Sequence, residues 1–377
     1  MRTRLSWHNL IHDKPRTAVA LAGVVFALLL IFLELGFLGS VVTTATVIYD
    51  HLDFDVLLTS PEYIDIRKTG TLPRYRLNQA AALPQVTGAE PLYIGLNVWK
   101  HPFTRRGRGI LVLAARRPHE VFVLREGGTP DYRQLHRADA VLIDRRSRPD
   151  FGPQEAGIRT EVGGQRVEIA GQFTLGTGFC ADGAILTSDE GFARLFPGHT
   201  VDRVSLGLVK LDPGADADAV ADKLRRALPA DVRVYTRSEI ASHETRFWLT
   251  TTSVGVIFGF GTIVAVLVGV GIVYQVLSAD ITKNRAEFAT LKAIGYGPRY
   301  LAGCVMEEAV LLGILSFLPA VVLAELLYRG TAAAANIPIG MTWGRAALVL
   351  ALAVAMCVVS GLAALRKIAV ADPADLF

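Results

Sequence analysis

The chain has 377 residues, of which 51% are hydrophobic and 20% are charged. This composition is too apolar for an ordinary soluble protein and too charged for one buried wholly in lipid, so it predicts a few membrane spans and one sizeable water-exposed domain. The net charge of +4 comes from 39 basic and 35 acidic residues spread along the chain, with no long block of one sign. Such a distribution gives little support to nucleic-acid binding.

The N-terminal residues 1–16 carry four basic side chains against one acidic one, directly before an uncharged run. The positive-inside rule predicts that they lie in the cytoplasm, as a short surface helix, ahead of a first span over residues 17–49. A cleaved signal peptide is the rival interpretation, but the apolar run is longer than a signal core.

Glu34 lies roughly 27 Å beyond Arg16 along the helix. We expect it near the outer interface, solvated or paired at a dimer contact, with an ion relay as the alternative.

Residues 50–246 have frequent proline and glycine, dispersed charge and strand-like runs. Because this block follows a span whose N-terminus is inside, we expect it to be periplasmic. Both of its ends read as strand, helix, strand, and the middle reads as a small β-rich insert with a hairpin turn at Gly163–Gly164. The elements predicted at the two ends are 54–60, 76–83, 89–100 and 109–115, then 203–211, 217–228 and 232–236. The predicted fold class is therefore an α-helical membrane protein with four transmembrane helices plus a large α+β extracytoplasmic domain.

The periplasmic block offers little chemistry. Its histidines stand singly, with no pair at metal-ligand spacing, so neither a metal site nor a catalytic residue is assigned. Asp139 and Asp144 flank a short apolar run and are expected to be solvated. Cys180 is interpreted as a buried, tolerated cysteine, with a nucleophilic thiol as the alternative. We predict that the chain is not an enzyme.

A second helix is predicted over residues 247–279, which contain no charge. About 50 Å of helix exceeds the roughly 30 Å that a bilayer needs, so we expect this helix to continue outward as a stalk beneath the domain.

Residues 280–300 form a polar island between two apolar segments, with four basic side chains against two acidic ones. This excess predicts a cytoplasmic location. Small and apolar residues recur at helical spacing in its middle, and Gly295 is expected to end that helix. An amphipathic helix at the membrane face is a part that another protein could push on.

The third and fourth spans are predicted over residues 301–327 and 346–365, which leaves a cytoplasmic tail at 366–377. Small residues spaced four apart on the first two spans allow close helix approach and predict a homodimer in the membrane lipid. These dimer-packing candidates are Gly36, Ser40, Gly255, Gly259, Ala265 and Gly269. No phosphate-binding G-x-x-x-x-G-K-[ST] loop occurs, so no cofactor is assigned to this chain.

One span, a large outer domain and three further spans, together with NRAEFATLKAIGYGPRYLAGCVMEEAVLLGILS at 284–316, resemble the FtsX/MacB-type ABC transporter permeases. The N-terminal W-x-N-L-x-x-x-K-x-R resembles the DevC branch more narrowly, although Glu34 departs from that pattern. The residues that match the coupling motif of the family are Arg285, Glu287, Leu291, Lys292, Ala293 and Gly295.

This resemblance implies a homodimeric permease of the cell inner membrane, with porter-like halves around the β insert and both termini cytoplasmic. It further implies a separate MacB/DevA-like ATPase subunit, a periplasmic membrane-fusion adaptor and a TolC-like outer-membrane protein. The ATPase would move the coupling helix, and the outer domain would expel a substrate. Two alternatives stay open: an FtsX-like regulator of a cell-wall hydrolase, and a membrane-anchored binding receptor.

Overall fold

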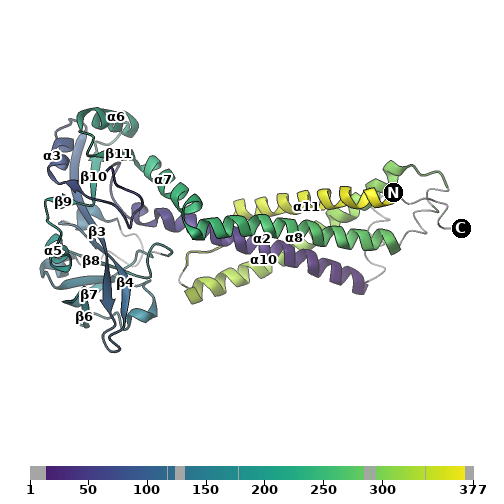
Figure 1. Ribbon diagram of the computed structural model, residues 1–377, viewed down its shortest axis with the longest axis horizontal. Helices are drawn as coiled ribbons and strands as arrows, with labels where there is room; N and C mark the ends of the chain where they lie inside the picture. The colour runs from purple at the N-terminus through teal and green to yellow at the C-terminus, as the bar shows by residue number, and fades with distance from the viewer. Residues whose placement is uncertain are drawn as a thin grey trace. The chain divides into compact units, whose positions relative to one another are not determined.

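The computed structural model describes residues 14–116, 118–123, 132–176, 178–283, 290, 294–335 and 337–369. They divide into two compact units (Figure 1). One unit holds Ser40–Val254 with Ala333–Pro338, and the other holds the chain up to Gly39, Gly255–Ala332 and the chain from Ile339 onward.

Four helices of the described chain are long and apolar enough to cross a membrane. They are α2 (Lys14–Asp50), α8 (Ser253–Lys283), α10 (Pro298–Ala335) and α11 (Trp343–Ala369). Two hydroxyls in this apolar unit bond to backbone carbonyls of neighbouring helices, which satisfies them where water is absent. The Tyr328 hydroxyl donates to the Phe32 carbonyl, and the Ser360 hydroxyl donates to the Val270 carbonyl at 2.8 Å.

The stalk expected from residue 247 onward is not one continuous helix. Helix α7 (Arg237–Thr250) ends before α8 begins at Ser253. The hydroxyls of Thr250 and Thr252 donate to the carbonyls of Arg246 and Trp248, at 2.7 and 2.6 Å. Consecutive threonines offer such local bonds in place of helix propagation, which accounts for the interruption.

The two halves predicted at the ends of the α/β domain come together in one antiparallel sheet. Its strands run in the order β11, β1, β10, β3, with β1 bonded to both β10 and β11. Strand β10 thus separates β1 from β3, and helices α3 and α6 complete a βαββαβ unit of the ferredoxin-like kind. The bounds are β1 Val56–Thr59, α3 Tyr75–Ala81, β3 Val86–Lys100, β10 Leu206–Leu211, α6 Ala217–Ala227 and β11 Arg233–Thr236.

The β insert closes into a ring of strands that begins on the second half of β3. From there the order is β4, β8, β5, β7, β6, and β6 returns to β3 where Val162 pairs with Trp99. The bounds are β4 Gly107–Ala114, β5 Ala140–Asp144, β6 Arg159–Val162, β7 Gln165–Phe173 and β8 Ala184–Thr187. The hairpin predicted at Gly163–Gly164 is confirmed, since both glycines have positive φ and Val162 pairs with Gln165. Closure leaves the ring without an exposed edge.

Short elements complete the domain. They are β2 (Leu72–Pro73), β9 (Arg203–Val204), α4 (Pro118–Val121), α5 (Asp189–Leu195) and 3-10 turns at Tyr132–His136 and Pro149–Phe151.

Asp144, expected in solvent, is fully buried. Its carboxylate accepts from the backbone N–H groups of Arg146, Leu175 and Gly176 at 3.1, 3.0 and 2.8 Å, so it closes a turn. Asp139 is paired with Arg137 at 2.8 Å, as an exposed acid can be.

Candidate functional site at the end of the first span

Helix α7 carries a carboxylate on its buried face. A capping box between Thr236 and Glu239 starts the helix directly after β11. Ile240, Glu244 and Trp248 follow at intervals of four, which places them on one side of the helix. All three are buried, and Glu244 has no solvent exposure. The sequence therefore inserts an ionisable group into an otherwise apolar helix face.

Glu244 joins three chain segments that are far apart in sequence. Its Oε1 accepts a hydrogen bond at 3.1 Å from the hydroxyl of Tyr49, in the last turn of α2. The same oxygen accepts from the hydroxyl of Tyr63, in the loop after β1, and the two hydroxyls contact each other. Its Oε2 has no hydrogen-bond partner within the described chain. We call Tyr49, Tyr63 and Glu244 the junction cluster.

Burial controls the proton equilibrium of this carboxyl. Desolvation raises the pKa of Glu244 to about 7, and the charge of Asp65 acts in the same direction. The hydroxyls of Tyr63 and Tyr49 oppose the shift by donating to the carboxylate. Desolvation likewise holds the pKa of Tyr63 well above its ordinary value.

A second buried acid lies in the same region and is already paired. Asp65 binds the guanidinium of Arg67 at 2.7 Å, and Arg67 lies 4.6 Å from the centre of the Trp248 ring. The ring of Tyr63 lies 5.7 Å from that of His243. The guanidinium of Arg67 is thus committed to Asp65.

Arg237, the first residue of α7, fixes the backbone at the end of α2. Its guanidinium donates to the carbonyls of Tyr49, Leu52 and Phe54 at 2.9, 2.8 and 2.8 Å, and lies 4.2 Å from the centre of the Phe54 ring. The last carbonyls of a helix have no partner within that helix, and a basic side chain is a favourable one.

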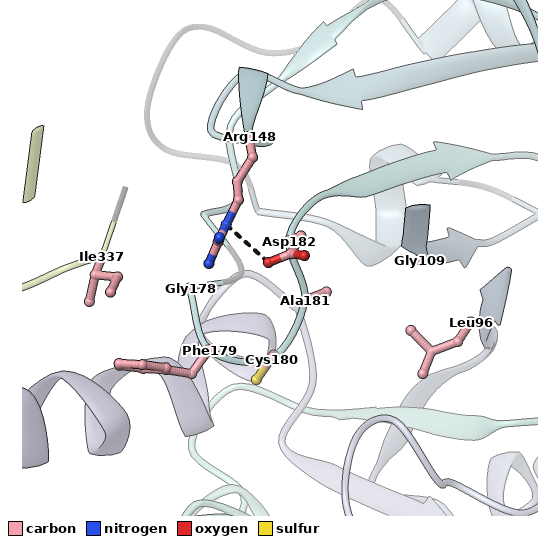
Figure 2. Close-up of a pocket in the computed structure, with 9 residues that line it drawn as sticks. All are labelled: Leu96, Gly109, Arg148, Gly178, Phe179, Cys180, Ala181, Asp182 and Ile337. Atoms are coloured by element: carbon pink, nitrogen blue, oxygen red, sulfur yellow. Dashed lines mark ion pairs between the residues drawn. The ribbon is translucent and has the colours of Figure 1, made fainter. Parts of the chain in front are cut away.

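A cavity of about 320 Å³ lies beside Cys180 in the same unit, and its rim carries an ion pair between Arg148 and Asp182 at 3.0 Å (Figure 2). The thiol of Cys180 donates to the carbonyl of Thr44 in α2 at 3.3 Å. Burial raises its pKa to about 12, so the thiol stays protonated at neutral pH. This environment favours a packing role for Cys180 over a nucleophilic one.

Most of the predicted coupling motif lies outside the described residues. The motif residues outside the described part of the chain are Arg285, Glu287, Leu291, Lys292 and Ala293. Most of the predicted N-terminal surface helix and of the C-terminal tail also lie outside it. Gly295 is described. It follows a helical hydrogen bond from Ile294 N–H to the Thr290 carbonyl at 3.0 Å and has a φ of 103°, which favours glycine. The coupling role itself stays a prediction.

The small residues of the first two spans have neighbours within the chain. The space beside Gly36 is filled by the ring of Tyr328, and a Cβ on Gly269 would lie 2.6 Å from Met356 Sδ. Ala265 is buried, as are Ser40 and Gly255, whereas a Cβ on Gly259 would meet no atom within 4 Å. Close packing of these helices inside one protomer explains most of the set, and the homodimer stays a prediction.

Glu34 also contacts its own chain. A Cβ on Gly261 of α8 would lie 2.5 Å from Glu34 Oε2, and that oxygen is buried with no hydrogen-bond partner in the described part of the chain. The acid therefore lies against a helix of its own protomer instead of projecting freely into solvent.

Comparison with known proteins decides the family. Residues 258–373 match the family described as FtsX-like permease C-terminal. Over these residues the chain is an FtsX-like permease. This match spans the helices α8, α10 and α11 that hold the membrane unit together, and it makes the permease a multi-pass membrane protein of the ABC type. The narrower DevC assignment stays a prediction.

Solved structures similar to the permease cover its α/β domain. The periplasmic region of MacB from Actinobacillus actinomycetemcomitans is 10% identical with a TM-score of 0.37, over 52% of this chain and 94% of that one. The extracellular domain of the noncanonic ABC-type transporter YknZ from Gram-positive bacteria is 14% identical with a TM-score of 0.35, over 49% of this chain and all of that one. No curated protein matches the permease in sequence.

Proposed function

We propose that the permease transmits ATP-driven motion from a separate cytoplasmic ATPase subunit to its α/β domain, which expels a substrate from the periplasm or the outer leaflet. The family implies an ATPase partner in general. A homodimer, a membrane-fusion adaptor, a TolC-like duct and cytoplasmic termini complete the proposal on the strength of the coupling motif.

One observation carries this proposal. The end of α2 from Ser40 onward belongs to the same compact unit as the α/β domain. Arg237 binds carbonyls at the end of that helix and just beyond it, and Tyr49 is bonded to Glu244 in the domain. A displacement of the end of α2 must therefore displace β1 and α7 with it. This is what a transmission element requires, whereas a receptor domain on a flexible tether would need no such connection.

The test is co-expression of the full permease with an ATPase subunit, followed by co-purification and by hydrogen exchange of β1 and α7 with and without trapped nucleotide. We expect ATPase capture and a nucleotide-dependent change in both elements. Glu287→Lys should abolish capture by reversing a charge in the coupling motif. Glu155→Lys, which reverses an exposed charge on the domain, is the matched control.

The outcomes separate the candidate functions. Absence of a captured ATPase would contradict the proposal and favour the receptor. Capture of an ATPase together with a cell-wall hydrolase, and without an adaptor, would favour the FtsX-like regulator. Equal capture by Glu287→Lys and the unsubstituted chain would show that the polar island is not the contact.

A further inference from the structure

The junction cluster is the one place where this unit, as far as it is described, joins three separate segments through a single buried carboxyl. Tyr49 ends α2, Tyr63 lies in the loop after β1, and Glu244 lies in the middle of α7. Each hydroxyl bonds to the same carboxyl oxygen. Loss of that oxygen from the cluster would leave one of the two buried tyrosine hydroxyls without an acceptor, since only one can donate to the other, and such a group is costly to leave unpaired.

The charge balance around this carboxyl is unfavourable to its ionised form. The charge of Asp65 disfavours ionisation of Glu244, and the guanidinium of Arg67 is bonded to Asp65 at 2.7 Å rather than to Glu244. Glu244 Oε2 is buried with no hydrogen-bond partner in the described chain. An ionised Glu244 would thus be a desolvated charge that neutral donors alone, the hydroxyls of Tyr63 and Tyr49 and the indole of Trp248, stabilise. A buried carboxylate without a cation is strongly disfavoured.

We infer that Glu244 is a proton-binding site that latches the end of α2 to the α/β domain: the protonated carboxyl holds the junction cluster together, and loss of the proton loosens it. The inference concerns the domain alone and does not rest on the exporter assignment. Burial brings the pKa of this carboxyl to about 7, so modest pH changes outside the cell would shift the latch between its two states.

The other groups facing Glu244 respond differently to pH. Tyr63 has a pKa well above its ordinary value, and burial raises the pKa of Cys180, in the loop after β7, to about 12. The indole of Trp248 is not ionisable, and Arg67 is paired with Asp65. His243 stacks between Tyr63 and Tyr235 with both ring centres at 5.7 Å, and its Nε2 lies 3.1 Å from the Ile64 carbonyl. His243 is therefore the other ionisable side chain whose role an experiment must exclude.

Cys180 supplies a reporter. Its thiol is bonded to the Thr44 carbonyl of α2, so release of the end of α2 should expose it. Full-length protein in detergent is treated with N-ethylmaleimide at about pH 6 and about pH 8.5, and labelling of Cys180 is followed by peptide mass spectrometry. Each rate is divided by the rate for Glu244→Gln at the same pH, which cancels the intrinsic reactivity of the thiol.

We expect a ratio near one at the lower pH and roughly tenfold faster labelling of the unsubstituted protein at the higher pH, because the glutamine cannot ionise. Tyr63→Phe, which removes one hydrogen bond without adding a charge, should speed labelling at both pH values. His243→Gln should keep the full pH response. The same ratio at both pH values, or a response abolished by His243→Gln, would overturn the latch.

Discussion

The guanidinium of Arg237 donates a 2.9 Å hydrogen bond to the backbone carbonyl of Tyr49, which connects the first residue of α7 to the last turn of α2. These residues are separated by most of the α/β domain in sequence. They meet because β1 pairs with β11, where Val56 lies opposite Thr236, so the connection reports on the assembly of that part of the sheet.

Replacement of Arg237 by alanine should destabilise the domain by about 2–4 kcal/mol, because carbonyls at the end of α2 would lose charge-assisted hydrogen bonds. The stability of Arg237→Lys should lie between those of Arg237→Ala and the unsubstituted protein, since an ammonium cannot reach three carbonyls as a planar guanidinium does. Thermal unfolding in detergent measures both. Arg233→Ala, at an exposed position on β11, is the control and should leave Tm unchanged. An equal loss at both positions would contradict the assignment.

The free energy of unfolding should fall as pH rises from the unfolded-state pKa of Glu244 through its folded-state pKa. Its pKa is raised from 4.5 to about 7 in the folded protein, so the folded state binds more protons than the unfolded state between these values. The stabilisation that the Glu244 proton gives to the folded state is fully present below pH 4.5 and is lost as pH rises through about 7. The free energy of unfolding changes by about 3 kcal/mol over this range. Chemical unfolding at a series of pH values should show this slope, and Glu244→Gln should flatten it. A slope that survives the substitution would assign it to other groups.

Gly261 and Glu34 should show strong energetic coupling. Gly261→Ala would place a methyl group 2.5 Å from Glu34 Oε2, so the helices must move apart or the carboxylate must rotate. We expect a loss of about 1–3 kcal/mol, largely restored by Glu34→Ala in the same chain. Gly271→Ala, where a Cβ would meet no atom within 4 Å, is the matched control. Additive losses in the double variant would show that the two residues do not contact each other.

Asp144 should control the turn that leads to Cys180. Asp144→Ala would leave the N–H groups of Leu175 and Gly176 without their acceptor, at a cost of about 2–4 kcal/mol. Labelling of Cys180 should become faster as the turn loosens. Asp139→Ala, which removes an exposed acid, should change neither stability nor labelling. Unchanged labelling in Asp144→Ala would mean that Cys180 is held by α2 alone.

Sequence patterns were sufficient for much of the fold and for little of the site. The apolar runs and the strand and helix spacing at both ends of the domain are local signals, so the spans and the βαβ elements were predictable. That both ends share one sheet depends on the pairing of β1 with β10 and β11, which no local pattern encodes. Asp144 was misjudged because the N–H groups that donate to it come from a loop that follows a different strand.

The junction cluster left one sequence signal that was not used. Glu244 lies four residues from Ile240 and from Trp248, so a helix from Arg237 would place its carboxyl in an apolar stripe. A charge at such a position is either an error in the helix assignment or a buried functional group. Its tyrosine partners could not have been predicted, since they lie nearly two hundred residues away in sequence.

The chain enters the ring of strands along β3 and leaves it just before β10, and these two segments are hydrogen-bonded to each other. Ser205 N–H donates to the Leu92 carbonyl at 3.1 Å, and its hydroxyl bonds to both the N–H and the carbonyl of Ile94, at 2.9 and 3.1 Å. Beyond this point Leu92 pairs directly with Leu206. A two-residue hairpin turn across that pair would restore an uninterrupted βαββαβ sheet. Inserts of other shapes could be grafted there to give the same membrane scaffold a new specificity, provided that they replace the backbone hydrogen bonds that join Val121 to Asp53 and Val123 to His51.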